Sequence, residues 1–204
     1  GLTHPNPAVG AVIVKDGKIA GTGYHRKAGR PHAETIAIRN AGGKAKGATV
    51  YVNLEPCCHY GMTPPCTNAI IKSGIKRVVV AAVDPNPLNA GKGIKALKDA
   101  GIKVEVGALR SEAKQLNEDF LKYIKTKMPF VILKVAMSLD GRIATGSGDS
   151  KWITGERARR YVHELRSRVD AVMVGLNTVK KDNPMLTSHG AGKNPLRIIL
   201  DSHA

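Results

Sequence analysis

Three side chains suited to binding a borderline-soft metal ion lie near the starts of predicted helices. His32 opens one such helix, Cys57 follows a predicted strand, and Cys66 opens a second helix nine positions later. One imidazole and two thiolates suit Zn²⁺, and three protein ligands leave the fourth tetrahedral position for water. Helix N-termini also lower the pKa of a thiol, which favours the thiolate that a metal requires. The spacing therefore predicts a zinc site of the catalytic type.

Glu34 follows His32 by two residues and is the predicted acid–base group of this site. In the first turn of a helix its carboxylate can point past the metal toward a bound water. Two thiolates and a neutral imidazole balance the charge of Zn²⁺, which lowers the pKa of its water toward neutral pH. Glu34 would accept the water proton and deliver it to a leaving amine. These groups can hydrolyse an amidine-like carbon and release ammonia.

Two side chains next to Cys57 leave open which residues bind the metal and whether the site is catalytic or structural. Cys58 is adjacent to Cys57, and one tetrahedral site does not readily accept both, so we interpret Cys58 as a bystander. His59 could act as a fourth ligand, which would close the site and make it structural. A zinc-stabilised binding module without enzymatic activity is therefore a second hypothesis. It predicts that Glu34→Gln changes nothing measurable.

Alternating strands and helices are predicted to position these groups. Apolar runs of strand length cover residues 9–14, 49–54, 77–83 and 102–106. Asp16-Gly17 predicts a tight hairpin, which makes the first two strands antiparallel. Glycine-terminated helices are predicted over residues 32–41, 65–73 and 93–100. This alternation is typical of an α/β layer fold.

A change of pattern near residue 128 predicts a domain boundary, with domains at 1–127 and 128–204. Before it, a single amphipathic helix is predicted over 111–125, with Ala113, Leu116, Phe120 and Ile124 on one face. After it, the predicted elements are strands at 130–137, 170–175 and 196–201 and a helix at 156–168. The second domain stops directly after a strand, so we expect it to be truncated.

Several sequence strings carry a resemblance to a known family. The zinc deaminase signature is H-x-E with P-C-x-x-C, whereas eight residues separate Cys57 from Cys66 here. The string LEPCCHYGMTPPC, together with HPNPAVGAVIV and VDPNPLNAGKG, resembles the bifunctional deaminase/reductase family of riboflavin biosynthesis. KVAMSLDGRIA and GDSKWIT resemble the reductase half of the same family. The resemblance covers essentially the whole chain.

The resemblance implies a fold and two reactions. The fold would be a cytidine-deaminase-like three-layer α/β/α domain followed by a partial dihydrofolate-reductase-like α/β domain. The first domain would deaminate 2,5-diamino-6-ribosylamino-4(3H)-pyrimidinone 5′-phosphate with zinc, and the second would reduce the ribosyl side chain to ribityl with NADPH. No G-x-G-x-x-G follows a predicted strand, so a Rossmann cofactor site has no support.

The resemblance also implies binding residues. The pyrimidine pocket would include Asn6 and His59. The phosphoribosyl substrate of the reductase would be held by Ser150, Arg166, Leu186 and His189, and NADPH by Ala136, Trp152, Thr178, Asp182 and Ser202. Three positions depart from the family pattern: Ile36 where a second His often follows HAE, Met62 where a basic residue often precedes TPPC, and His189 where an Arg is expected.

Composition restricts the cellular location and the partners that we expect for this chain. Hydrophobic residues make up 42% of the chain, and no long uninterrupted apolar run is present, so we expect a cytoplasmic protein with no membrane partner. The formal net charge of +16 keeps a nucleic-acid base deaminase as the alternative function. However, the basic residues are spread out and only 4% of residues are aromatic, which favours a phosphorylated small molecule over nucleic acid. The family suggests a homo-oligomer, a dimer or tetramer.

Overall fold

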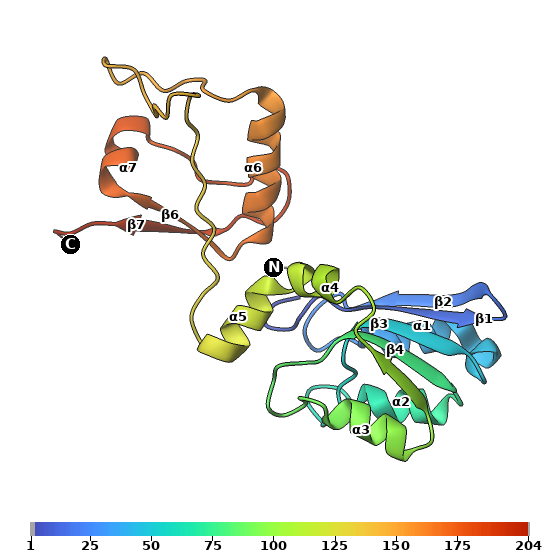
Figure 1. The fold of residues 1–204 in the computed structure, drawn as a ribbon. Coiled ribbons are helices and arrows are strands. Elements are labelled where there is room, and N and C mark those ends of the chain that lie inside the picture. The colour runs from blue at the N-terminus through green and yellow to red at the C-terminus, as the bar shows by residue number, and fades with distance from the viewer. Residues whose placement is uncertain (1–2, 204) are drawn as a thin grey trace. The chain divides into compact units, whose positions relative to one another are not determined.

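The computed structural model describes residues 3–203 and divides them into two compact units, 3–131 and 132–203. The first unit is built on a five-stranded sheet with the order β2-β1-β3-β4-β5 (Figure 1). Its strands are β1 (Gly10–Lys15), β2 (Lys18–Tyr24), β3 (Thr49–Leu54), β4 (Arg77–Ala82) and β5 (Lys103–Val106). Strand β1 is antiparallel to β2 and β3, while β3, β4 and β5 are mutually parallel.

The hairpin predicted at Asp16-Gly17 is confirmed. Lys15 pairs with Lys18, and both turn residues have positive φ angles, of 50° and 72°. This is the backbone shape that an Asp-Gly pair adopts most readily between antiparallel strands. The turn places β2 at the edge of the sheet, beside the helix that carries His32 and Glu34.

Helices cover both faces of the sheet, which gives the three layers (Figure 1). One face is covered by α1 (Ala33–Ala41), the short 3₁₀ turn η1 (Gly42–Ala45), α2 (Cys66–Lys72) and α3 (Lys92–Asp99). The main core lies between these helices and the sheet and includes the fully buried Ile13, Val50, Ile70 and Leu97. On the other face, α4 (Arg110–Leu116) packs on β3 and β4 and is followed by α5 (Glu118–Thr126). The α/β fold predicted from the sequence is confirmed.

The single helix predicted over residues 111–125 is wrong, because the chain breaks at Asn117 into α4 and α5. Asn117 has φ −121° and ψ 27°, outside the helical region, and its side chain is buried. The amide of Asn117 bonds to the backbone of Ala8 instead of facing solvent. A tertiary contact therefore overrides the helical periodicity that Ala113, Leu116, Phe120 and Ile124 show in the sequence.

The second unit contains α6 (Glu156–Arg168), β6 (Ala171–Gly175), α7 (Leu176–Asp182) and β7 (Leu196–Leu200). Strands β6 and β7 are parallel neighbours, as their βαβ connection through α7 requires. Helix α7 was not predicted from the sequence. Its seven residues are too few to show a clear periodic pattern.

The strand predicted over residues 130–137 is also wrong. Within the described chain this segment pairs with no neighbouring strand, and Val131 and Leu133 are 74% and 86% exposed. A strand needs a partner for its backbone groups, so an apolar run by itself does not define one. In the described residues, no helix combines the length and the apolar character needed to cross a membrane.

Candidate active site

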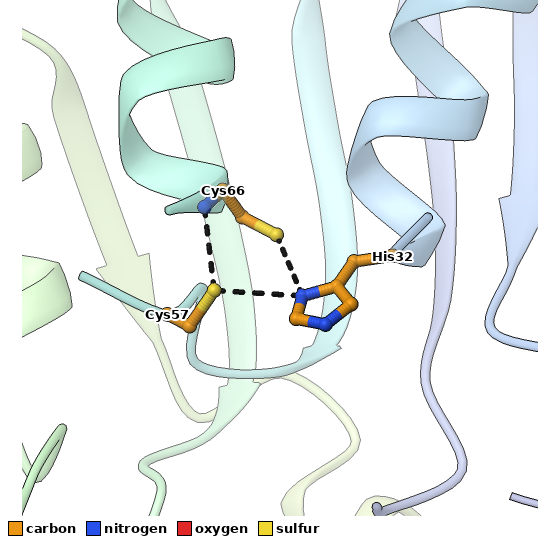
Figure 2. A group of neighbouring side chains, drawn as sticks. All are labelled: His32, Cys57 and Cys66. Carbon is orange, nitrogen blue, oxygen red and sulfur yellow. Dashed lines mark hydrogen bonds between the residues drawn. The ribbon is translucent and has the colours of Figure 1, made fainter. Parts of the chain in front are cut away.

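The three predicted metal ligands meet at the N-termini of two helices on one face of the sheet (Figure 2). His32 is the N-cap residue of α1, and Cys66 is the first residue of α2. Cys57 comes three residues after the end of β3, so its loop returns toward α2. The positive ends of α1 and α2 both favour negative charge at this place. The fold therefore brings together residues that are 34 positions apart in the sequence.

The geometry of the three side chains fits Zn²⁺. Nδ1 of His32 lies 3.1 Å from Sγ of Cys66 and 3.5 Å from Sγ of Cys57, and the ligand atoms all lie within 4.8 Å of one another. Tetrahedral zinc with bonds of about 2.0 Å to nitrogen and 2.3 Å to sulfur places these atoms about 3.5 Å apart. Within the described residues, His59 and Cys58 are not part of this convergent set. The arrangement is the three-ligand site predicted from the sequence.

Hydrogen bonds around the triad favour a thiolate at Cys57. The hydrogen bond with the Cys66 thiol, assisted by His32, lowers the pKa of Cys57 to about 4. The same hydrogen bond and burial raise the pKa of Cys66, so in the absence of metal the proton stays on Cys66. The backbone N–H of Cys66 also donates to Sγ of Cys57 at 3.3 Å. Nδ1 of His32 faces the sulfurs, and a hydrogen bond of 3.2 Å between Nε2 and Oγ1 of Thr63 fixes the orientation of the ring.

Glu34 lies in the first turn of α1 and is only 3% exposed. Burial, followed by the nearby charge of Cys57, raises the pKa of its carboxyl group. Glu34 lines the same pocket as His32 and Cys57. A buried carboxyl group with a raised pKa beside a metal site can act as a proton acceptor and donor during a reaction.

A pocket of about 270 Å³ opens over the triad. Asn6 and His59, the predicted pyrimidine contacts, both line it. Asp84 and Asn86 line it as well and were not selected from the sequence. They follow the end of β4, the edge at which the carboxyl ends of parallel strands gather ligand-binding residues, and this position was the available signal. Burial raises the pKa of Asp84.

His25 is a second residue of this pocket that the sequence reasoning missed. It is buried, and Nε2 accepts a hydrogen bond from Nδ2 of Asn6 at 3.0 Å. Its proton must then be on Nδ1, which donates to the carbonyl oxygen of Pro31 at 3.3 Å. The ring also lies edge-on to that of His32, with centroids 5.2 Å apart. His25 therefore orients Asn6, whose Oδ1 is left as an acceptor.

The predicted residues of the second unit fall into separate groups. Ser150 and Trp152 line an open pocket of about 350 Å³. Arg166, on α6, donates to the carbonyl oxygen of Thr187 at 3.3 Å, beside the buried Leu186. The ring of His189 lies 4.2 Å from that of His163. Thr178 and Asp182 are on α7, Ala136 is in the extended segment before residue 138, and the exposed Ser202 follows β7.

A zinc-ligand triad with a buried carboxylate on an α/β/α scaffold defines the class of zinc-dependent deaminases. Residues 1–82 match the cytidine and deoxycytidylate deaminase zinc-binding region, and residues 129–204 match the RibD C-terminal domain. The chain belongs to the riboflavin biosynthesis deaminase/reductase family. The family assignment made from the sequence motifs is confirmed.

Individual relatives agree with this assignment. Riboflavin biosynthesis protein RibD of Aquifex aeolicus is 60% identical over 203 residues, which cover 98% of this chain and 57% of that protein. The RibD of Escherichia coli is 50% identical, with 98% and 58% covered. The crystal structure of a diaminohydroxyphosphoribosylaminopyrimidine deaminase/5-amino-6-(5-phosphoribosylamino)uracil reductase from Thermotoga maritima is 52% identical, with a TM-score of 0.92 over 98% of this chain and 58% of that one. The chain thus spans a little over half the length of these relatives.

Proposed function

We propose that the first unit hydrolyses the 2-amino group of 2,5-diamino-6-ribosylamino-4(3H)-pyrimidinone 5′-phosphate and releases ammonia. The observation that carries this proposal is the convergence of His32, Cys57 and Cys66 beside the buried Glu34. The substrate class comes from the relatives, one of which is named as a deaminase and reductase of phosphoribosylaminopyrimidines. The pocket volume of about 270 Å³ suits a planar heterocycle.

Zinc held by the three ligands would supply a water of lowered pKa for attack on the ring carbon. The Glu34 carboxylate would serve as the proton acceptor when water attacks and as the proton donor to the departing amine, so one carboxyl group would serve both proton transfers. Because Glu34 is buried, its protonated form is not penalised, which suits a group that must hold the proton between the two steps.

The remaining pocket residues would hold the pyrimidine. Oδ1 of Asn6 is left as an acceptor by the bond between Nδ2 and His25, so it suits an N–H of the base. His59 has a buried Nδ1 with no protein partner, and this atom is available to a substrate. Val9, Leu54 and Phe120 supply apolar surface for the ring faces. Together these contacts orient the reacting carbon toward the metal side of the pocket.

For the second unit we propose the NADPH-dependent reduction of the ribosyl side chain, completed by the part of the family's length that this chain does not span. Ser150, Arg166, Leu186 and His189 would hold the phosphorylated substrate, and Ala136, Trp152, Thr178, Asp182 and Ser202 would contact the cofactor. The planar guanidinium of Arg166 suits two phosphate oxygens. The proposal also includes a cytoplasmic homo-oligomer whose partner is a small phosphorylated molecule, without nucleic acid or membrane. The net charge of +16 favours encounter with such an anion.

The experiment compares three substrates with the zinc-loaded chain: the diaminopyrimidine ribosylamine phosphate, a cytidine nucleotide and a transfer RNA. We expect ammonia release from the first substrate only, and a release that is about 10²–10⁴-fold slower after Glu34→Gln, the range that general acid–base groups contribute. Release from the RNA alone would replace the proposal with a nucleic-acid base deaminase. Zinc binding without release from any substrate would favour the binding module.

A further inference from the structure

Asn117 connects two walls of the pocket without lining it. It stands at the break between α4 and α5, is 2% exposed, and is among the largest fully buried polar side chains of the described residues. Its φ of −121° turns the chain so that α5 brings Phe120 and Ile124 to the pocket. The mechanism proposed above does not use Asn117.

The side chain of Asn117 pairs with the backbone of Ala8 much as a neighbouring strand would. Oδ1 accepts from the N–H of Ala8 at 2.7 Å, and Nδ2 donates to the carbonyl oxygen of Ala8 at 2.9 Å. The two residues are 109 positions apart. Both hydrogen bonds are part-buried, and replacing the amide would remove the partner of the Ala8 N–H and one of the donors to the Ala8 carbonyl oxygen.

Asn53, on β3, holds the same segment from the sheet side. Its Nδ2 donates to the carbonyl oxygen of Ala8 at 2.8 Å, and its Oδ1 accepts from the N–H of Gly10 at 2.8 Å. The carbonyl oxygen of Ala8 therefore receives one hydrogen bond from each asparagine. The backbone before β1 is fixed by two side chains at the point where β-sheet pairing has not yet begun.

The segment held in this way forms the wall opposite α5. Pro5, Asn6, Pro7 and Val9 all line the pocket. Proline fixes φ, so Pro7 leaves little freedom between Ala8 and Asn6, and a shift at Ala8 reaches the Asn6 side chain. Asn6 in turn bonds to His25, which touches the ring of the zinc ligand His32.

We propose that Asn117 is a positioning residue for the pyrimidine: its two bonds to Ala8 set the distance between the Asn6 wall and the Phe120 wall. The inference rests on the proposed deaminase function. Asn117 itself touches neither the metal ligands nor the space for the substrate. Its loss therefore weakens substrate binding while leaving the zinc and the proton transfer by Glu34 in place.

The kinetic test uses Asn117→Leu, which keeps most of the side-chain volume and removes both bonds, and Asn117→Ala as a second variant if the first is poorly folded. We expect KM for the diaminopyrimidine substrate to rise about tenfold or more, while kcat stays within about threefold. The reason is that a displaced Asn6 wall loses one or two hydrogen bonds to the substrate, and each such bond corresponds to roughly one decade in affinity. Bound zinc stays at one per chain. Ile102→Ala, in the main core and outside the pocket lining, is the stability control and leaves KM unchanged.

A double-mutant cycle with Asn6→Ala separates positioning from general destabilisation. If Asn117 acts through Asn6, the two substitutions together raise KM little more than Asn6→Ala alone, because the affected contact is already gone. Fully additive effects on KM would overturn the proposal. An equal KM increase in Ile102→Ala would overturn it as well.

A readout without substrate keeps this inference distinct from the proposed function. Amide hydrogen exchange at Ala8, followed by NMR in the zinc-loaded chain, is expected to be at least about tenfold faster in Asn117→Leu, with Val78 in the interior strand β4 unchanged. Unaltered exchange at Ala8 would overturn the proposal that Asn117 holds the backbone of Ala8. Absence of ammonia release from the unmodified chain, by contrast, would count against the deaminase proposal, and the exchange result would stand independently.

Discussion

At the scale of single residues, the two adjacent cysteines have different environments. Cys57 points into the triad with His32 and Cys66, whereas the backbone N–H of Cys58 bonds to Oδ1 of Asn89 and its thiol is outside the convergent set. Burial raises the pKa of Cys58, and the hydrogen bond with Cys66 lowers that of Cys57. Of these two adjacent cysteines, only Cys57 is therefore suited to be a thiolate ligand.

This contrast predicts the zinc content of two variants. Cys57→Ala removes one of three protein ligands, so we expect it to lose most of its bound zinc after dialysis, while Cys58→Ala keeps one zinc per chain. Elemental analysis of the purified proteins measures both. A stoichiometric zinc in Cys57→Ala would contradict the assignment of the ligands.

The residue scale also shows where sequence reasoning reached its limit. His32, Glu34, Cys57 and Cys66 were found because metal chemistry restricts the residue types and their spacing. His25 and Asn117 were not found, since a lone histidine or asparagine has many structural uses. Their roles depend on contacts to Asn6 and Ala8, which only the tertiary fold defines.

At the scale of elements, the position of His32 depends on how closely α1 packs on β2. A Cβ atom at Gly23 of β2 would lie 2.2 Å from the carbonyl oxygen of Ala33 and 2.6 Å from the backbone nitrogen of Ala37. Both contacts are with helix backbone, which cannot rotate away. Glycine at this position allows α1 to approach the sheet.

Gly23→Ala is therefore expected to lower the free energy of unfolding by about 2 kcal/mol or more and to weaken zinc binding, because α1 must move away from the sheet. Urea unfolding and a competition assay with a zinc chelator measure the two effects. Gly43→Ala, at a site with open space around the new methyl group, serves as the control and should change neither. Equal stability of the two variants would show that the close packing is not required.

The pairing of β4 with β5 carries an ion pair that gives a pH prediction. Arg77 donates to both carboxylate oxygens of Glu105, at 3.1 and 2.6 Å, and Lys103 lies 3.3 Å from the same carboxylate. The bond with Arg77, followed by that with Lys103, lowers the pKa of Glu105. A lowered folded-state pKa means that the stabilisation is present above the ordinary glutamate value and disappears as pH falls through the folded value.

We accordingly expect Glu105→Gln to have a lower melting temperature than the unmodified chain at neutral pH, and the difference to shrink below about pH 4. Both side chains are partly exposed, so the effect is small and decreases with added salt. Differential scanning calorimetry across this pH range measures it. A difference that grows on acidification would contradict the assignment of the shift.

Elements were easier to predict from the sequence than their boundaries and breaks. Strand β3 and helix α6 begin and end at the predicted residues. The failures lie at 111–125 and 130–137, where the pattern was right but the surroundings decided the outcome. The amide of Asn117 is occupied by Ala8, and the apolar run after Phe130 has no partner strand in the described chain.

At the scale of the whole molecule, the chain consists of two units, and each contains a feature that can be followed separately. The zinc triad lies in residues 3–131, and Trp152, the only tryptophan of the sequence, lies in residues 132–203. Trp152 is 71% exposed with the guanidinium of Arg159 over its ring at 4.2 Å. Its fluorescence therefore reports on the second unit alone.

Zinc removal is expected to destabilise only the first unit. A ligand present at about a thousandfold above its dissociation constant contributes about 4 kcal/mol, so chelation should lower the melting midpoint of the first unit by more than about 10 °C. Circular dichroism follows that transition, and Trp152 fluorescence should melt at the same temperature with and without chelator. A joint shift of both signals would show that the units unfold together.

In the proposed reaction, zinc held by the triad and the carboxylate of Glu34 together perform hydrolytic deamination. The most direct measurement is ammonia release from the diaminopyrimidine ribosylamine phosphate while the metal-free chain is titrated with zinc, with Glu34→Gln titrated in parallel. We expect no release without zinc, a rise that ends at one zinc per chain, and no comparable rise in Glu34→Gln although it binds the metal equally. Release by the metal-free chain, or a full rate in Glu34→Gln, would contradict it.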